Sequence, residues 1–329
     1  ANTLKKRSGC KSKKYDISSD FATNYIYMAG LTITSTQDSK IQNLIETEME
    51  KSKYVLQSKT GGDPSQAAMV IIDHKNGYVL GCVGGLGEKT TPRSLNRATQ
   101  SIRQTGSAIK PIAVVGPAIQ KRIIVASSIY DDTEKDFPGG YHPVDYSKAL
   151  GKITVRRAIE SSQNIPFVEI MQELKPSVSM DYLERLGITT LTEEDNNLSL
   201  ALGGLQKGIS PLEMAAAYAA IANDGEYIEP VFYQNIKNHS GETIITSKQD
   251  TRRVFSKETA FILKELLTQP VEGSNGTATY CKINGIDVAA KTGTTDSNYD
   301  RWLCGFTPYY TGVTWYGYDQ NETVNFNIN

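Results

Sequence analysis

The sequence predicts a fold of the α/β (α+β) class, with one antiparallel sheet built from both ends of the chain and covered by helices. Near the start, apolar runs at 67–72 and 78–83 flank Asn76 and Gly77, a residue pair typical of a tight hairpin turn. Near the end, three strand candidates follow one another at 286–292, 301–307 and 311–318. Because helical patterns fill much of the chain between these groups, we expect the first and last strands to pair in one sheet.

The clearest helix of the middle segment runs from Ser210 to Asp224. Ser210 is a typical N-cap, Pro211 suits the first helical position, and Glu213 completes a capping box. Gly225 follows as a stop signal. Local sequence therefore predicts both ends of this helix.

Two more helices are expected around it. Ser256 opens one that continues through the apolar positions 260–267. Another covers 154–160 and ends at the polar residues Ser162 and Asn164, just before Pro166. Because a loop at the end of a helix can project polar side chains into a cleft, this second helix bears on function.

Length and composition favour one large domain. The 329 residues with 39% hydrophobic content can bury a substantial core. The net charge of −1 gives no field that would attract nucleic acid, so we expect no nucleic-acid partner. The first fourteen residues are basic, and we expect residues 1–29 to be a tail or linker remnant and 30–329 to be the domain. No apolar run reaches the ~18 residues of a membrane-spanning helix.

Ser107 and Lys110 form an S-x-x-K pattern at the head of an apolar run. On a helix the two side chains would share a face one turn apart. A hydroxyl beside an amine that can take its proton is a nucleophile with its base. Pro111 suits a helix that starts near Ser107, and the free N–H groups of such a start would face a developing oxyanion. The pattern predicts acyl chemistry in which lysine replaces histidine as the base.

Each short motif of this kind occurs twice, and its surroundings separate the copies. The weaker copies lie in the basic tail, in a glycine-rich turn and in a polar stretch: Ser8 with Lys11, Lys59 to Gly61, and Ser94 with Asn96. The stronger copies border predicted elements: Ser107 with Lys110, Ser162 with Asn164, and Lys291 to Gly293. The last of these follows a small-residue run and is expected to end a strand in open backbone, which suits the binding of a ligand.

The ordered set resembles the motifs of penicillin-binding proteins and active-site-serine β-lactamases. Four other segments and a longer stretch around Lys291 resemble the transpeptidase domain of class A penicillin-binding proteins. They are QAAMVIID at 66–73, NRATQ at 96–100, ALGG at 201–204 and WLCGFTP at 302–308, with KTGTT at 291–295. The resemblance covers about residues 30 to 320. It implies a β-lactamase/transpeptidase-like fold, in which a five-stranded antiparallel sheet is flanked by helices and faces an all-helical lobe.

The resemblance also implies roles for individual residues. Ser107 is the expected nucleophile and Lys110 its base, with Ser162 relaying a proton and Asn164 positioning Lys110. Lys291 is expected to hold Lys110 neutral by its charge. A substrate-binding and oxyanion-stabilising strip is expected at Thr292, Gly293 and Thr294. No metal or other cofactor is expected.

The function implied is that of a serine D,D-transpeptidase that cross-links peptidoglycan stem peptides ending in D-Ala-D-Ala and is inhibited covalently by β-lactams. A D,D-carboxypeptidase and a non-enzymatic β-lactam-sensing receptor domain are the alternatives. The family carries a membrane anchor and a glycosyltransferase domain, so we expect an excised or processed part of a longer protein that acts at the outer face of the bacterial cell membrane. The segment 321–329 lacks the final helix that the resemblance leads us to expect.

Overall fold

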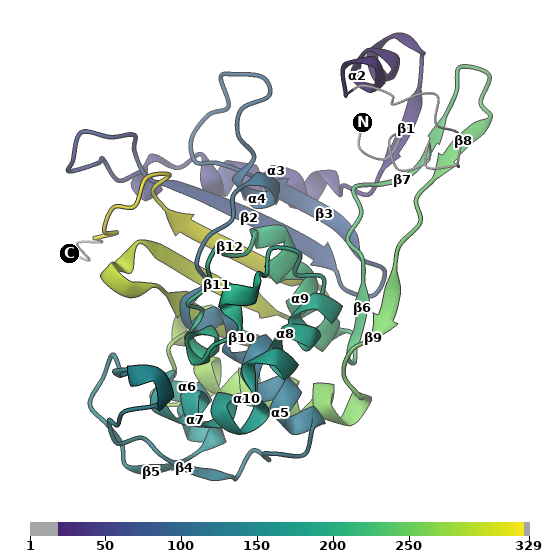
Figure 1. Ribbon diagram of the computed structural model, residues 1–329. Coiled ribbons are helices and arrows are strands. Elements are labelled where there is room, and N and C mark those ends of the chain that lie inside the picture. The colour runs from purple at the N-terminus through teal and green to yellow at the C-terminus, as the bar shows by residue number, and fades with distance from the viewer. Residues whose placement is uncertain (1–18, 326–329) are drawn as a thin grey trace.

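A computed structural model describes residues 19–325, with side chains from Thr23 onward. Its centre is a five-stranded antiparallel sheet in the order β10-β11-β12-β2-β3. The strands are β2 (Gln66–Asp73), β3 (Tyr78–Val83), β10 (Ala289–Thr294), β11 (Asp300–Phe306) and β12 (Thr311–Gly317). β12 pairs with β2, placing Val313 opposite Val70 and Trp315 opposite Ala68. The prediction that the two ends of the chain meet in one sheet is confirmed (Figure 1).

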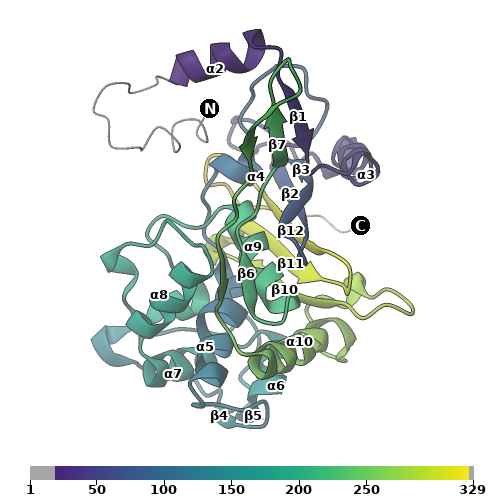
Figure 2. The same cartoon turned by 90° about the vertical axis from the view of Figure 1, so that its right-hand side faces the viewer.

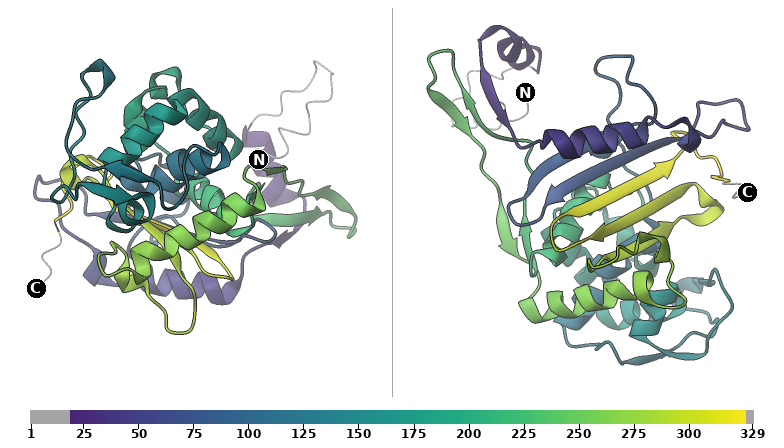
Figure 3. Two further views of the ribbon diagram at one scale, coloured as in Figure 1. Left: turned by 90° about the horizontal axis from the view of Figure 1, so that it is seen from below. Right: turned by 180° about the vertical axis from the view of Figure 1, so that it is seen from behind.

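Helices cover one face of the sheet and form a lobe beyond it (Figure 1). They are α5 (Gly116–Gln120), α6 (Val155–Ser161), α7 (Ile165–Leu174), α8 (Pro176–Arg185), α9 (Pro211–Ala222) and α10 (Lys257–Glu272). α9 packs against β2, β11 and β12, where the inward side chains of Val70, Val313 and Trp315 are fully or almost fully buried. Seen from behind, α3 (Ser39–Met49) lies along the sheet beside β3 (Figure 3).

A ribbon-like arm extends away from the sheet (Figure 2). It contains α2 (Ser19–Met28) and the three-stranded sheet of β1 (Thr32–Ser35), β7 (Tyr233–Lys237) and β8 (Thr243–Thr246). Two further strand pairs are β4 (Ile129–Asp131) with β5 (Lys152–Thr154), and β6 (Glu226–Ile228) with β9 (Thr251–Arg253).

None of the helices in 19–325 combines the length and apolar character needed to cross a membrane.

The remaining helices are short. They are α4 (Arg97–Gln100) and the 3₁₀ turns η1 (Ser52–Tyr54), η4 (Pro138–Gly140), η5 (Glu193–Asp195), η6 (Leu198–Leu202), η7 (Thr279–Cys281) and η8 (Asp296–Asn298). The basic residues of the expected tail lie outside the described residues, whereas helix α2 falls within its proposed range of 1–29. The domain boundary at residue 30 therefore stays a prediction.

Most helix and strand ends lie close to the positions that local sequence signals predicted. Ser210 caps α9, its hydroxyl accepting the Glu213 N–H at 3.3 Å while Glu213 Oε2 accepts the Ser210 N–H at 3.0 Å. Gly225, predicted as the stop signal of this helix, lies past the end of α9 in a left-handed conformation with φ +85°. The expected strand 286–292 is wrong at both ends. It starts later, at residue 289, because Gly285 (φ +80°) makes a turn that pairs Ile283 with Ile286. β10 then runs through the whole KTGT segment.

The predicted helix near Ser107 is present, but its geometry changes along its length. η2 (Gly106–Ile109) is a 3₁₀ helix, η3 (Pro111–Val115) is a π-helix, and α5 follows. The change falls at Pro111, which has no backbone N–H to donate. In a 3₁₀ helix residues three apart lie directly above one another, so Ser107 and Lys110 share a side. Tyr218 of α9 fixes this segment from behind by donating to the carbonyl O of Ala108 at 2.6 Å.

Two glycines let the Ser107 segment lie directly against β10. A Cβ on Gly106 would lie 2.3 Å from the carbonyl O of Thr294, and Gly106 also has φ +50°. A Cβ on Gly293 would lie 2.3 Å from the carbonyl O of Thr105. Backbone therefore meets backbone where the helical lobe and the sheet edge join.

Replacing Ser210 by Ala should lower the free energy of unfolding by roughly 1 kcal/mol, because α9 would lose the acceptor for its N3 amide. Urea or thermal unfolding followed by circular dichroism measures this change. Ser240→Ala, in the exposed turn between β7 and β8, is the control. Equal effects of the two substitutions would show that the cap contributes nothing.

Replacing Gly106 by Ala should destabilise the protein far more than Gly61→Ala. Both glycines have positive φ, +50° and +81°, so each alanine costs about 1–2 kcal/mol of backbone strain. Nothing lies within 4 Å of a Cβ on Gly61, whereas at Gly106 the contact with Thr294 adds roughly 1–3 kcal/mol. Unfolding curves of the two variants measure the difference, and equal losses would contradict the close approach.

Candidate active site

Ser107 is the only residue of the stretch 105–119 that is not buried. The backbone just before Ser107 is held in place, since Trp302 of β11 donates its indole N–H to the carbonyl O of Gln104 at 2.7 Å. Just before this, Arg103 forms an ion pair with Asp300 at 2.7 Å. A hydroxyl that reaches the surface from an otherwise buried helical segment is available to a substrate while its backbone is held in place.

Lys110 lies completely inside the protein, with 0% exposure. Its Nζ donates to the carbonyl O of Ser162 at 2.9 Å, to the carbonyl O of Gln163 at 2.8 Å and to Oδ1 of Asn164 at 2.7 Å. All three partners lie on one short loop between α6 and α7. The S-x-x-K and S-x-N segments, 52 to 54 residues apart, are therefore joined through one amine.

The loop has the conformation that these contacts need because of how α6 ends. Ser162 is the C-cap of α6 and adopts a left-handed conformation with φ +61°, which is unusual for a residue other than glycine. Its N–H donates to the carbonyl O of Ala158, while Asn164 and Pro166 lead directly into α7. The loop therefore points two carbonyl oxygens toward Lys110 and the hydroxyl of Ser162 toward Lys291.

That hydroxyl meets Lys291 of β10. Lys291 is also 0% exposed, and its Nζ donates to Oγ of Ser162 at 2.7 Å and to the carbonyl O of Thr292 at 3.0 Å. Burial lowers the pKa of Lys291 to about 7. Across the sheet the nearest partner of Lys291 is Cys304, whose thiol pKa is raised by burial, so that neighbour stays neutral.

Burial, reinforced by the charge of Lys291, lowers the pKa of Lys110 well below its ordinary value. The three oxygen acceptors around Nζ, together with the charges of Asp145 and Asp132, oppose this shift because they favour the ammonium form. Burial prevails, since Lys110 is fully enclosed and faces a second cation. A neutral Lys110 amine has two N–H groups and one lone pair. It can therefore donate to only two of the three surrounding oxygens, and its lone pair is free to accept a proton.

The residues after Lys291 form the open edge of the sheet. β10 is bonded to β11 on one side, and no described strand pairs with its other side. Thr292 Oγ1 lies 2.8 Å from Oγ1 of Thr277, Gly293 is buried against the Ser107 segment, and Thr294 is exposed. The three predicted residues therefore lie together beside Ser107, with free backbone along one edge.

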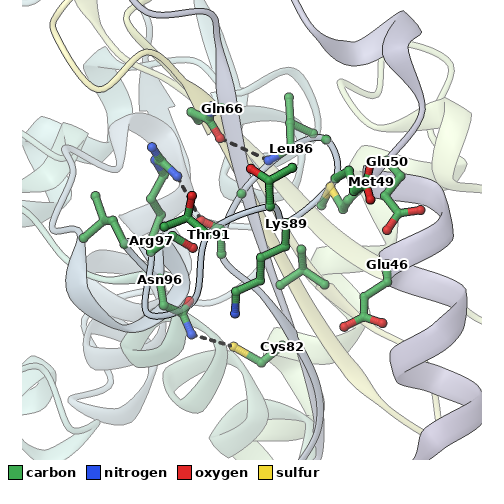
Figure 4. A pocket seen from close by; sticks show the side chains of 18 residues that line it. Glu46, Met49, Glu50, Gln66, Cys82, Leu86, Lys89, Thr91, Asn96 and Arg97 are labelled. Carbon is green, nitrogen blue, oxygen red and sulfur yellow. Dashed lines mark hydrogen bonds between the residues drawn. The ribbon is translucent and has the colours of Figure 1, made fainter.

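The weaker copies of the motifs lie elsewhere. Ser94 and Asn96 line a hollow of about 480 Å³ between α3 and the segment that follows β3, where Asn96 donates to the thiol of Cys82 (Figure 4). Lys59 and Thr60 bond to Glu322 in an exposed turn. Ser8 and Lys11 lie outside the described residues.

Several residues that shape the site carry no motif in the sequence. Gln163, between the two motif residues, bonds through its side chain to Asp132 at 2.6 Å, and Asp145 accepts the N–H of Asn164. Trp302, which the sequence marked only as part of the segment 302–308, anchors the backbone ahead of Ser107. No short pattern marks such partners, because they come from distant parts of the chain.

Comparisons with known proteins give the family. The model of the penicillin-binding protein transpeptidase domain matches residues 67–327. Penicillin-binding protein 1F of Bacillus subtilis (strain 168) is 37% identical over 317 residues, covering 94% of this chain and 42% of that protein. Penicillin-binding protein 1A of Clostridium botulinum (strain Langeland) is 32% identical over 314 residues, covering 92% of this chain and 38% of that protein. The chain thus spans about two fifths of the length of these relatives.

Solved structures agree. The penicillin-binding protein PonA1 from Mycobacterium tuberculosis matches with a TM-score of 0.78 at 25% identity, covering 94% of this chain and 81% of that one. PonA1 in complex with penicillin V matches with a TM-score of 0.76 at 27% identity, covering 92% and 81%. The expected β-lactamase/transpeptidase-like fold is therefore confirmed. The chain belongs to the penicillin-binding protein transpeptidase family, in its class A branch.

Proposed function

We propose that this domain is a serine D,D-transpeptidase that cross-links peptidoglycan stem peptides through an acyl-enzyme on Ser107. One observation carries the proposal: the half-buried Ser107 stands one 3₁₀ turn before a buried lysine with a lowered pKa. Family membership supports the same reaction class.

In the first step, the neutral amine of Lys110 takes the proton of Ser107 as its oxygen attacks the carbonyl carbon of the substrate. Lys110 becomes an ammonium, and the three oxygens of the Ser162–Asn164 loop then receive all three of its N–H groups. The negative charge on the former carbonyl oxygen is stabilised by the N–H groups of Ser107 and Thr294. The contact between Gly106 and Thr294 supports that pairing of donors.

Collapse of the intermediate requires a proton for the departing amine. Ser162 supplies it through its hydroxyl, which is bonded to the amine of Lys291 at 2.7 Å and can be reprotonated from there. Terminal D-alanine leaves and the acyl group stays on Ser107. Attack by an amine of a second stem peptide then forms the cross-link and breaks the ester to Ser107. The oxygen of Ser107 takes back the proton held by Lys110, and the proton of the attacking amine passes to the Ser162–Lys291 pair. Attack by water in place of the amine gives the carboxypeptidase product.

Recognition of a peptide that ends in a carboxylate needs a cation and hydrogen-bond donors at the edge of β10. Lys291, with the hydroxyls of Thr292 and Thr294, supplies these. Asn164 accepts a hydrogen bond from Lys110 and lies two residues after Ser162, which suits a group that also positions the substrate amide. A β-lactam presents the same carbonyl and carboxylate, so it should acylate Ser107 and remain bound.

The setting of the reaction follows from the substrate and the relatives. Peptidoglycan lies outside the cytoplasmic membrane, so the domain acts there. The greater length of the relatives supports a glycosyltransferase domain in the full-length chain. β-Lactam antibiotics are the expected inhibitors.

Incubation with penicillin should add one penicilloyl group to Ser107, located by peptide mass spectrometry. Ser107→Ala should abolish the adduct and the release of D-alanine from D-Ala-D-Ala peptides, while Ser94→Ala should change neither. An adduct on another residue would contradict the site. Acylation without any D-alanine release would instead favour a β-lactam-sensing domain, and turnover of a chromogenic cephalosporin within seconds would favour a hydrolase.

The rate of acylation by a fluorescent penicillin should follow a bell-shaped curve as the pH is raised. The rate rises as Lys110 loses its proton and falls above about pH 7, where Lys291 loses the charge that attracts the carboxylate. Lys291→Gln removes the charge that lowers the pKa of Lys110, so the acidic limb should move to higher pH and the alkaline limb should vanish. The maximum rate should fall roughly 10- to 100-fold.

Exposed Lys148→Gln is the matched control for this experiment. It should leave both limbs in place. An acidic limb that stays at the same pH in Lys291→Gln would show that the two lysines do not interact.

A further inference from the structure

Two carboxyl groups lie behind the loop that holds Lys110. Asp132 follows β4 and is fully buried, and Asp145 lies in the segment that connects β4 to β5 at the lower edge of the helical lobe (Figure 1). Neither is part of the motifs that identify the family. The two carboxyl groups contact Gln163 and Asn164, the loop residues that follow Ser162.

Each carboxyl group uses one oxygen to hold this region. Asp132 Oδ2 accepts the side-chain N–H of Gln163 at 2.6 Å and the backbone N–H of Leu150 at 2.8 Å. Asp145 Oδ1 accepts the backbone N–H of Asn164. Gln163 and Asn164 are two of the three residues whose oxygens surround Lys110 Nζ.

The other oxygen of each group is buried and has no donor among the described residues. These atoms are Asp132 Oδ1 and Asp145 Oδ2. The two carboxyl groups lie within hydrogen-bonding reach of each other, and burial with this neighbour raises the pKa of Asp145 to about 6. A single proton between the two oxygens would satisfy both of them at once.

We propose that Asp132 and Asp145 share one proton as a carboxylic acid–carboxylate pair, and that this pair positions the Ser162–Asn164 loop and, through it, the amine of Lys110. The inference rests on the proposed function for its catalytic meaning, while the shared proton itself stands on the geometry. Both aspartates are positioning residues, because they act through Gln163 and Asn164 and need not touch substrate. The proton belongs to the pair rather than to one member of it.

The sharing of a proton also limits the negative charge near the base. Two ionised carboxylates would favour the ammonium form of Lys110, whereas a singly charged pair favours it less. Other charged groups occur on the elements packed around the pair: Lys291 beyond Lys110, Lys135 bonded to Glu169 and to the carbonyl O of Asp131, Arg157 with Glu160, and His142 with Asp136. They are common to all variants described below, so their titration cancels in differences between variants.

Amide substitutions test the sharing of the proton directly. In Asp145→Asn the amide oxygen can accept from Asn164 and the amide nitrogen can donate to Asp132 Oδ1, reproducing the protonated carboxyl. Asp132→Asn can do the same with the roles exchanged. In the double variant two NH₂ groups face each other, and neither has an acceptor. Each single variant should therefore fold and be acylated by penicillin within about threefold of the wild-type rate, whereas the double variant should lose roughly tenfold or more.

The pH dependence of stability gives a second readout. Since the folded pKa is raised above the ordinary value, the wild type holds an extra proton in the folded state between about pH 4 and pH 6. The stability this gives is complete at the low end of that window and is lost as pH rises through about 6. Melting temperatures measured from pH 4.5 to 7.5 should show this loss in the wild type and in the control Asp63→Asn, an exposed position, but not in Asp145→Asn.

The outcomes separate the two proposals. A double variant that melts and acylates like the single variants, or an unchanged pH dependence in Asp145→Asn, would overturn the shared proton. Wild-type protein that penicillin does not acylate would overturn the proposed function, while the melting curves would still decide whether the proton is shared. A double variant that fails to fold, beside single variants that fold, supports the pair.

Discussion

The amine of Lys110, enclosed by the protein and surrounded by three oxygens of one loop, is the interaction on which the rest of the site depends. An amine without solvent cannot keep a charge unless oxygens replace the water that it has lost. The loop supplies these oxygens only because Ser162 ends α6 in a left-handed conformation. One strained residue thus connects the end of a helix to the protonation of the Lys110 amine.

The same loop also connects the two halves of the domain. Its carbonyl oxygens face Lys110 of the helical lobe, while the hydroxyl of Ser162 faces Lys291 of the sheet. Each lysine makes the charged form of the other less favourable, so the two amines cannot both be charged in this space without cost. Lysine is suited to this arrangement because its pKa responds strongly to burial, whereas histidine would titrate near neutrality without it. Burial is therefore a condition of the chemistry as well as a feature of the packing.

Much of the fold and the whole motif set could be predicted from sequence, because both depend on local signals. The capping box at Ser210 and the turn at Gly77 are specified within a few residues, and the structure places the helix and hairpin where these signals predicted them. The three-stranded arm was not predicted, since β1 is short and exposed and pairs with β7 across about 200 residues. The 3₁₀-to-π change at Pro111 also depends on tertiary packing. Asp132 and Asp145 could not be predicted, because no nearby residue in the sequence marks them as partners of Gln163 and Asn164.

The position of the site at a junction links stability to reactivity. Ser107 and Lys110 belong to the lobe and Lys291 to the sheet edge, so the site exists only while the two parts are docked. The docking surface next to the serine is glycine backbone, with Gly106 against Thr294 and Gly293 against Thr105, and a contact of this kind cannot adjust as a side chain would. Tyr218 and Trp302 hold the same segment through single hydrogen bonds to its carbonyl groups. A small shift of the lobe would separate the serine from the Thr294 N–H and Lys110 from the charge of Lys291 together. The precision of the site therefore depends on close backbone packing, and the chemistry of the side chains depends on that precision.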